Sequence, residues 1–333
     1  MNGKRENWVD DVKTFACILV VLGHFYQSMV KSSIVPDSSF YGWFIDTIYL
    51  FHVQLFFFCS GYLYQKYSEV RSVKAWCTNI WKKLVVLGVP YLVFTFATWL
   101  LKKLFEGSVN NKAGSIVDSL FVEPIAPYWY LYVLFFLFVL TITMRKKTEA
   151  YVLLIIALVF KALPFFGLKT GIYLVGKIMA DWIWFALGMA VAVGAVKICK
   201  MYLGVLTGVL FVAVSIVCHI YGKHTLAIDF ILGLLAVLAV ISIATGIDEK
   251  REQPVFKYLS KYTMPVFLMH TLFAAPVRSV LLKLGVKNAI IHVVVGLIIS
   301  FVGPIISMVI IEKLKPLDFI VYPGRYLKKE KRN

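Results

Sequence analysis

Charged residues are scarce in this chain, and acidic ones are the scarcest. Only 16% of the 333 residues are charged and 60% are hydrophobic, and the 18 Asp and Glu are outnumbered by 35 Lys and Arg. Soluble domains carry about 25% charged residues, so the composition excludes an ordinary soluble fold. Apolar runs long enough to cross a bilayer as a helix recur along the whole chain.

Cysteine pairs with the spacing of metal ligands are also missing. The five cysteines, Cys17, Cys59, Cys77, Cys199 and Cys218, form no CxxC pair. Three of them lie in apolar runs, where a thiol behaves as a small hydrophobe. We therefore expect neither a disulfide nor a metal site. The alternating pattern of an outer-membrane barrel is absent as well, so the sequence predicts an all-α, polytopic integral membrane protein.

A basic patch interleaved with aromatic residues, typical of nucleic-acid binding, is not found either. The formal net charge of +17 is instead expected in cytoplasmic loops beside anionic lipid headgroups. The N-terminus lacks the features of a cleaved signal peptide, because Asp10 and Asp11 precede the first apolar run and no small-x-small cleavage site follows it.

About ten transmembrane helices are predicted from the apolar runs. Their ranges are 14–30, 43–64, 84–101, 127–144, 150–163, 171–193, 201–220, 225–245, 263–282 and 289–311. If the N-terminus is cytoplasmic, the inner segments hold 24 of the 35 Lys and Arg, so the positive-inside rule places both termini in the cytoplasm. No linker divides the chain, which predicts one transmembrane domain over 1–333 without a soluble extracytoplasmic domain.

Two histidines within apolar runs are the first candidates for a functional site, since an ionisable residue in a membrane segment is functional by default. His24 follows Lys13 by eleven residues, about 20° beyond three full helical turns and about 16 Å along the axis. Lys13 is thus expected at the cytoplasmic edge, on the same face as His24 near the midplane. His52 enters from outside to a similar depth. Each histidine alone could simply hydrogen-bond to a neighbouring helix, but their matched depth favours a function.

The motifs around these histidines resemble a known family. The first part of the chain is similar to the opening of the membrane acyltransferase-3 family, of the bacterial polysaccharide O-acetyltransferase type. The similarity rests on Asp10-x-x-Lys13, followed after ten residues by His24, and on the later motif Phe51-His52-x-x-Leu55-Phe56-Phe57-x-x-Ser60-Gly61. Three further segments resemble later elements of the family: Lys82-Lys83 running to Pro90-Tyr91, Tyr128-Trp129-Tyr130-Leu131, and Ser260 to His270. The chain departs from many members, which carry Arg where it has Lys13 and Phe where it has Tyr130. Lysine keeps the charge but lacks the bidentate fork that grips phosphate.

The resemblance implies transfer of an acyl group, usually acetyl from cytoplasmic acetyl-CoA, to a sugar hydroxyl. The acceptor would be a cell-envelope or capsular polysaccharide or its lipid-linked precursor, and the enzyme would lie among the lipids of a bacterial plasma membrane. No permanently bound cofactor is implied. The choice between an acetyl and a succinyl donor, the sugar, and self-association into a homo-oligomer stay open.

Site residues follow from the same resemblance. His24 would act as a general base or accept the acyl group itself, and the sequence leaves both routes open. His52 and Ser60 would orient His24 or stabilise the oxyanion, completing the catalytic set. Lys13, Lys82 and Lys83 would meet the phosphates of CoA on the cytoplasmic side. Asp10, Trp129 and His270 are assigned supporting roles, Trp129 being equally explained as an interfacial anchor and His270 as a packing residue.

Two other classes of function fit the composition. A proton-coupled transporter or lipid-linked oligosaccharide flippase could use the buried histidines as a proton relay, although inverted repeats and broken helices rich in Gly and Pro are not evident. A polymerisation or sensing component without chemistry of its own is the weaker alternative. Lys177 and Asp181 stand four residues apart on one helical face and are expected to neutralise each other.

Overall fold

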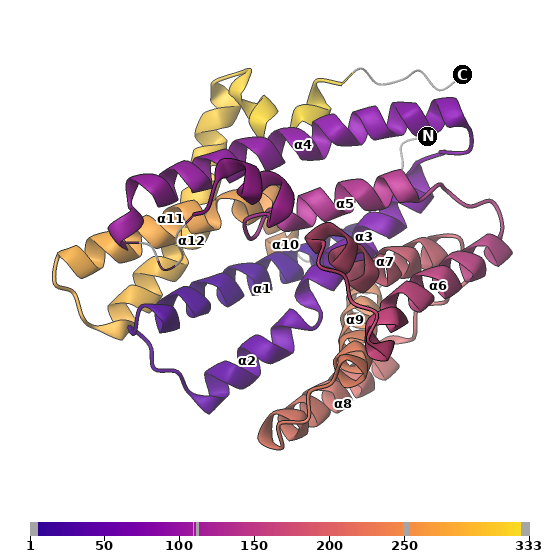
Figure 1. The fold of residues 1–333 in the computed structure, drawn as a ribbon, viewed down its shortest axis with the longest axis horizontal. Coiled ribbons are helices and arrows are strands. Elements are labelled where there is room, and N and C mark those ends of the chain that lie inside the picture. Colours follow the sequence, from indigo (N-terminus) through magenta and orange to yellow (C-terminus); the bar gives the residue numbers. More distant parts are fainter. Residues whose placement is uncertain (1–5, 109, 111–112, 249–253, 328–333) are drawn as a thin grey trace.

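The chain folds into a bundle of helices of very different lengths (Figure 1). The structure, a computed structural model, describes residues 6–108, 110, 113–248 and 254–327, and these residues form no strand. The helices are α1 (Asn7–Lys31), α2 (Ser39–Tyr49), α3 (His52–Tyr67), α4 (Val73–Leu104), α5 (Trp129–Leu140), α6 (Lys147–Ala162), α7 (Tyr173–Ala192), α8 (Met201–Ile220), α9 (Leu226–Asp248), α10 (Pro254–Leu259), α11 (Thr263–Lys283) and α12 (Ala289–Lys313), with short helical turns η1 (Glu106–Ser108), η2 (Asp118–Val122), η3 (Leu163–Phe166), η4 (Ser260–Tyr262), η5 (Leu317–Ile320) and η6 (Pro323–Arg325).

The all-α, polytopic fold is confirmed. Among the described residues, eight helical segments are long and apolar enough to cross a membrane. They are Ser39–Tyr67, Val73–Leu104, Lys147–Phe166, Tyr173–Ala192, Met201–Ile220, Leu226–Ile247, Phe256–Lys283 and Ala289–Lys313. The two remaining predicted helices correspond to α1 and to α5. With 12 residues, α5 reaches only about 18 Å.

Four of the predicted helices differ from those in the structure. The first, predicted over 14–30, begins earlier, because α1 starts at Asn7. The predicted helix 43–64 is broken between α2 and α3, where Phe51 leaves helical geometry with φ −144° and ψ −20°. The basic segment after α3 is not a loop throughout, because α4 begins at Val73, with the Ser72 hydroxyl accepting a hydrogen bond from the Ala75 N–H. The predicted helix 127–144 is shortened at both ends to α5. Parts of the charged loop 248–261 and of the basic tail lie outside the described residues.

α1 and α11 lie side by side and run in the same direction. Near the start of both helices, the Thr14 hydroxyl is 3.4 Å from that of Thr263, and the Cys17 thiol donates to the Thr263 carbonyl. Contacts further along α1 fall progressively further along α11. The two helices therefore bring their side chains into contact at matching heights, which matters for the site described below.

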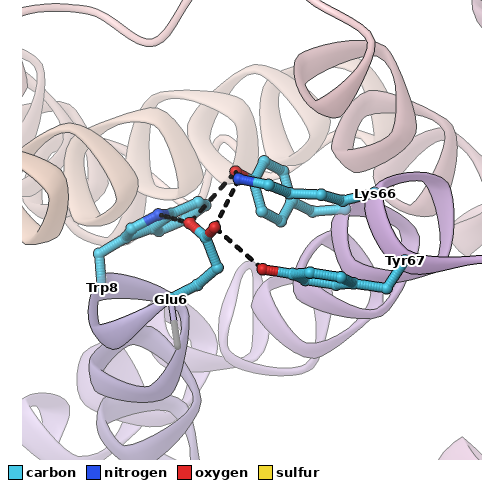
Figure 2. A network of polar contacts seen from close by, with 5 residues as sticks. Glu6, Trp8, Lys66 and Tyr67 are labelled. Atoms are coloured by element: carbon cyan, nitrogen blue, oxygen red, sulfur yellow. Dashed lines mark hydrogen bonds and ion pairs between the residues drawn. The ribbon is translucent and has the colours of Figure 1, made fainter. Parts of the chain in front are cut away.

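A polar network ties the start of α1 to the end of α3 (Figure 2). The Glu6 carboxylate accepts hydrogen bonds from Lys66 at 2.5 Å, from Tyr67 at 3.1 Å and from the Trp8 indole at 3.1 Å. Partial burial raises the pKa of the Glu6 carboxyl, but the hydrogen bonds from Lys66, Tyr67 and Trp8 outweigh it and hold that pKa below its usual value. Two helix ends predicted to face the cytoplasm thus lie together; which side of a membrane they face stays a prediction.

Candidate functional site: a histidine group between cationic ends

His24 on α1 faces His270 on α11. Their ring centroids are 5.5 Å apart and the rings are tilted by 35°. His270 is 1% exposed, and its Nδ1 lies 3.0 Å from the Val266 carbonyl and 3.1 Å from that of Phe267. Because a carbonyl only accepts, Nδ1 carries the proton and Nε2 presents a lone pair. Within the described residues Nε2 has no hydrogen-bond partner, whereas His24 keeps some accessible surface.

His52, at the start of α3, joins this group from a third helix. It is 2% exposed, and its Nδ1 donates to the Ile48 carbonyl at 2.6 Å, which again leaves Nε2 as the basic nitrogen. A positive charge on His52 or on His270 would repel one on His24, so both rings lie within electrostatic range of His24. The ring packed against His52 is Tyr49, at 4.7 Å between centroids. The structure therefore brings the two predicted histidines near each other, but the ring that His24 meets is His270.

Gly23 makes room for this arrangement. A Cβ atom at Gly23 would lie 3.1 Å from the Ile48 side chain and 3.2 Å from the ring of Tyr49, closer than most side-chain contacts. With only hydrogen there, Tyr49 can lie against α1, where its hydroxyl donates to the Gln27 amide oxygen at 3.0 Å. The glycine that precedes His24 thus allows the end of α2 to approach α1.

Ser60 has a different partner from the one predicted. Its hydroxyl lies 2.9 Å from the hydroxyl of Tyr130 on α5. Since the Tyr130 hydroxyl donates its proton to the Phe56 carbonyl at 3.3 Å, Ser60 is the donor of the shared bond. Ser60 is therefore held by Tyr130 rather than by either histidine. The sequence offered a signal for this contact, because Tyr130 is the position where many family members carry a phenylalanine without a hydroxyl.

Trp129 stands at the start of α5 with a cation over its ring. The Lys177 ammonium lies 4.2 Å from the centre of the indole ring, a cation–π distance. Lys177 was expected to pair with Asp181, and the two charges do act on each other. Asp181 is only 4% exposed and also interacts with the charge of Lys161, whose ammonium donates to the Ala180 carbonyl at 3.1 Å. Trp129 is thus part of a charged cluster between α5, α6 and α7.

Three predicted CoA-binding lysines come together at the end of the bundle where α1 begins. The Lys83 ammonium lies 3.9 Å from the ring centre of Phe138 and 5.9 Å from that of Tyr64. The charges of Lys82 and Lys13 both act on Lys83, although they come from α4 and α1. Asp10 lies one turn before Lys13, and the charges of both act on Cys59 of α3. This group, Lys13, Lys82 and Lys83, is called the inner cationic group below.

Among the described residues, no group of three or more His, Cys, Asp or Glu could hold a metal ion. What the residues can supply is proton transfer: a histidine with accessible surface, a second histidine fixed by two backbone carbonyls, and a third in electrostatic range.

The sequence of the chain was compared with known protein families and proteins. The family described as "Acyltransferase domain" matches residues 6–309. Nodulation protein NolL of Mesorhizobium japonicum is 26% identical over 136 residues, and nodulation protein NolL of Sinorhizobium fredii is 31% identical over 139. Each alignment covers 41% of this chain and 35% or 36% of the relative, so the chain matches about a third of the length of these relatives. No solved structure matches the chain.

Proposed function

Because the chain belongs to the acyltransferase-3 family, we propose that it transfers an acetyl group from cytoplasmic acetyl-CoA to a sugar hydroxyl. The acceptor is a cell-envelope or capsular polysaccharide, or its lipid-linked precursor, and the protein works in the plasma membrane of a bacterium. Family membership and the membrane-spanning helices make it a membrane acyltransferase; donor and acceptor are part of the proposal. The observation that carries it is the contact between His24 and His270, about 16 Å along α1 from Lys13 of the inner cationic group.

The histidine pair suits attack by a hydroxyl group, which is a poor nucleophile at neutral pH. In a direct transfer, His24 takes the proton of the sugar hydroxyl as its oxygen attacks the acetyl carbon, and then gives that proton to the departing CoA sulfur. In a relay, a His24 nitrogen attacks the acetyl carbon first and CoA leaves as its thiolate. The sugar hydroxyl then attacks the acetyl group on the imidazole, and its proton passes through the freed imidazole to the thiolate. Both routes need one nitrogen of His24 unprotonated, and the lone pair on His270 Nε2 favours a proton on the other.

His270 is therefore a positioning residue, and the His270→Phe variant tests this role. It keeps an aromatic ring in α11 but removes the Nε2 lone pair beside His24. We expect kcat to fall by about a hundredfold, at the low end of acid–base effects, while KM for acetyl-CoA stays constant. Measured kcat and KM across pH would show this, with the pH profile changed as well as lowered.

The matched control for His270 is His292→Phe. His292 is also 1% exposed, but it lies on α12, where its Nε2 donates to the Val286 carbonyl at 2.8 Å. Losing a buried histidine there should leave kcat near the wild-type value. Equal losses in both variants would mean that His270 acts only in packing.

The inner cationic group is proposed to bind the phosphates of CoA. Lys83→Met should raise KM for acetyl-CoA by about tenfold with little change in kcat, since a charged hydrogen bond contributes about 1.5–3 kcal/mol. Steady-state kinetics at low and high salt would measure this, and the difference should shrink as salt screens the charges. Lys74→Met is the control, because Lys74 is an exposed lysine in the first turn of the same helix. A KM equal to that of the wild type would contradict the assignment.

The proposed function is tested with purified protein and radiolabelled acetyl-CoA in detergent, offered several glycans. Label that leaves CoA for a glycan would support the acetyltransferase, and label that remains covalently on the protein would further favour the relay. If a folded sample neither binds nor consumes acetyl-CoA with any glycan, the proposed donor is wrong, and transport or flipping by a histidine relay becomes the better hypothesis.

A further inference from the structure

A buried arginine lies beyond the histidine pair, on the side away from the inner cationic group. Arg278 of α11 is 4% exposed within the apolar segment Phe256–Lys283. Its guanidinium donates to the Ser28 carbonyl at 3.4 Å and to the Ser28 hydroxyl. A charge buried in a membrane segment is costly and indicates a function. Neither the proposed acetyl transfer nor the binding of CoA makes use of it.

The position of Arg278 relative to His24 follows from the parallel packing of α1 and α11. Ser28 is four residues beyond His24, one helical turn and about 6 Å along the axis. Arg278 is eight residues beyond His270 and meets Ser28 from the neighbouring helix. The guanidinium is therefore about one turn beyond the histidine pair, whereas Lys13 is about three turns before it.

Two lysines extend this positive charge. Lys31 lies in the last turn of α1, and its charge acts on His24. It also acts on Lys102 in the last turn of α4, which is half-buried. Within the described part of the chain, no carboxylate forms an ion pair with either lysine. Arg278, Lys31 and Lys102, with the Ser28 hydroxyl, are called the outer cationic group.

Simple helix electrostatics explains only part of this group. Lysines in the last turn of a helix interact favourably with its dipole, which accounts for Lys31 and Lys102 separately. It does not account for Arg278, which is buried before the last turn of α11, or for cations of three helices meeting beside one histidine. The group is also unexpected by the positive-inside rule, since it lies at the end predicted to be extracytoplasmic.

We infer that the outer cationic group binds the phosphate or diphosphate group of the acceptor and so places its sugar hydroxyl at His24. The planar fork of Arg278 matches two phosphate oxygens, and the two lysines add charge without fixing an orientation. Ser28 can donate a further hydrogen bond to the same oxygens. The inference rests on the proposed function: CoA phosphates bind at the inner cationic group, the acceptor phosphate binds at the outer one, and His24 lies between them.

The test measures binding without turnover, on the full chain in nanodiscs of neutral phosphatidylcholine. Radiolabelled inorganic pyrophosphate is the probe in solution, and polyprenyl diphosphate in the disc is the competitor. We expect Lys31→Met/Lys102→Met and Arg278→Gln each to weaken binding by at least tenfold. Lys223→Met should bind as the wild type does, because Lys223 is an exposed lysine in the connection between α8 and α9, at the same end of the bundle.

Comparing the soluble probe with the lipid competitor distinguishes two possible sources of the phosphate. Competition by polyprenyl diphosphate far below the pyrophosphate concentration supports a lipid-linked acceptor, and equal competition supports a soluble sugar phosphate. Binding that is unchanged in Lys31→Met/Lys102→Met, or reduced equally in Lys223→Met, overturns the inference. If Arg278→Gln fails to fold, the inference can still be tested with Lys31→Met/Lys102→Met, because this double variant leaves Arg278 and its contacts with Ser28 in place.

Consumption of acetyl-CoA, measured in the same discs with the glycans of the functional test, keeps the two proposals apart. If the wild type consumes acetyl-CoA but its affinity for diphosphate does not depend on the outer cationic group, only the inference fails. If diphosphate binding depends on that group but acetyl-CoA is not used, the proposed function fails and the anion site stands.

Discussion

Replacing His24 with alanine is expected to lower acetyl transfer by about a thousandfold and to leave a folded, membrane-inserted protein. General acid–base catalysis contributes about 10²–10⁴-fold, and a covalent relay would be lost altogether. The cost in stability should be small, since no hydrogen bond in the described part of the chain involves the His24 ring. Release of CoA from acetyl-CoA is the measurement, with thermal unfolding of the same sample as the check on folding.

His219→Ala is the matched control for His24→Ala. His219 ends α8, where its ring lies 3.1 Å from the Ser39 hydroxyl and 3.7 Å from the Asp46 carboxylate. It is far along the chain from the proposed chemistry and should leave the rate unchanged. Full acetyl transfer by His24→Ala would refute the catalytic role of His24. An equal loss of rate in His24→Ala and His219→Ala would mean that the substitutions act by disturbing the fold.

The fold class was predictable because membrane crossing requires only length and hydropathy, and both can be read from one segment at a time. The break at Leu50 and Phe51 was not predictable in this way. It falls within the apolar run Ile48-Tyr49-Leu50-Phe51, which has no glycine or proline to mark it. An apolar run indicates that a segment is buried, but whether its helix is continuous depends on what packs against it.

The site was predictable only as far as single helices determine it. Helical periodicity placed Lys13 and His24 on one face, and the structure puts Lys13 with the inner cationic group. Helical periodicity could not show that α11, nearly 250 residues later in the chain, packs parallel to α1. The contact of His24 with His270 and the position of Arg278 both depend on that packing. An arginine within an apolar run was the signal that sequence reasoning missed.

The interface between α3 and α7 depends on two glycines in reciprocal positions. A Cβ on Gly61 of α3 would lie 2.0 Å from the Phe185 carbonyl oxygen, and one on Gly188 of α7 would lie 2.0 Å from that of Phe58. Such distances are far inside van der Waals contact, so each backbone lies directly against the glycine of the other helix. Small residues allow this approach between membrane helices, where packing rather than the hydrophobic effect holds them together.

Gly188→Val should therefore give almost no folded protein, which is the largest structural effect we expect. Gly188→Ala should fold with a lower melting temperature, because overpacking costs about 1–3 kcal/mol or more when a backbone must move. Size-exclusion chromatography and thermal unfolding in detergent measure both. Gly176→Ala is the control on the same helix, since its new Cβ would be 3.7 Å from the nearest atom, a methyl group of Thr170.

Gly188→Ala should also lose activity beyond its loss of folded protein. α3 carries His52 at its start and Ser60 further along, so pushing α3 away from α7 moves both residues relative to α1 and the histidine pair. Positioning errors of about 1 Å can cost about a hundredfold in rate. We thus expect the rate per folded molecule to fall in Gly188→Ala and to stay constant in Gly176→Ala. An unchanged melting temperature and rate in Gly188→Ala would mean that α3 and α7 pack less closely than the structure has them, and that the position of His52 does not depend on this contact.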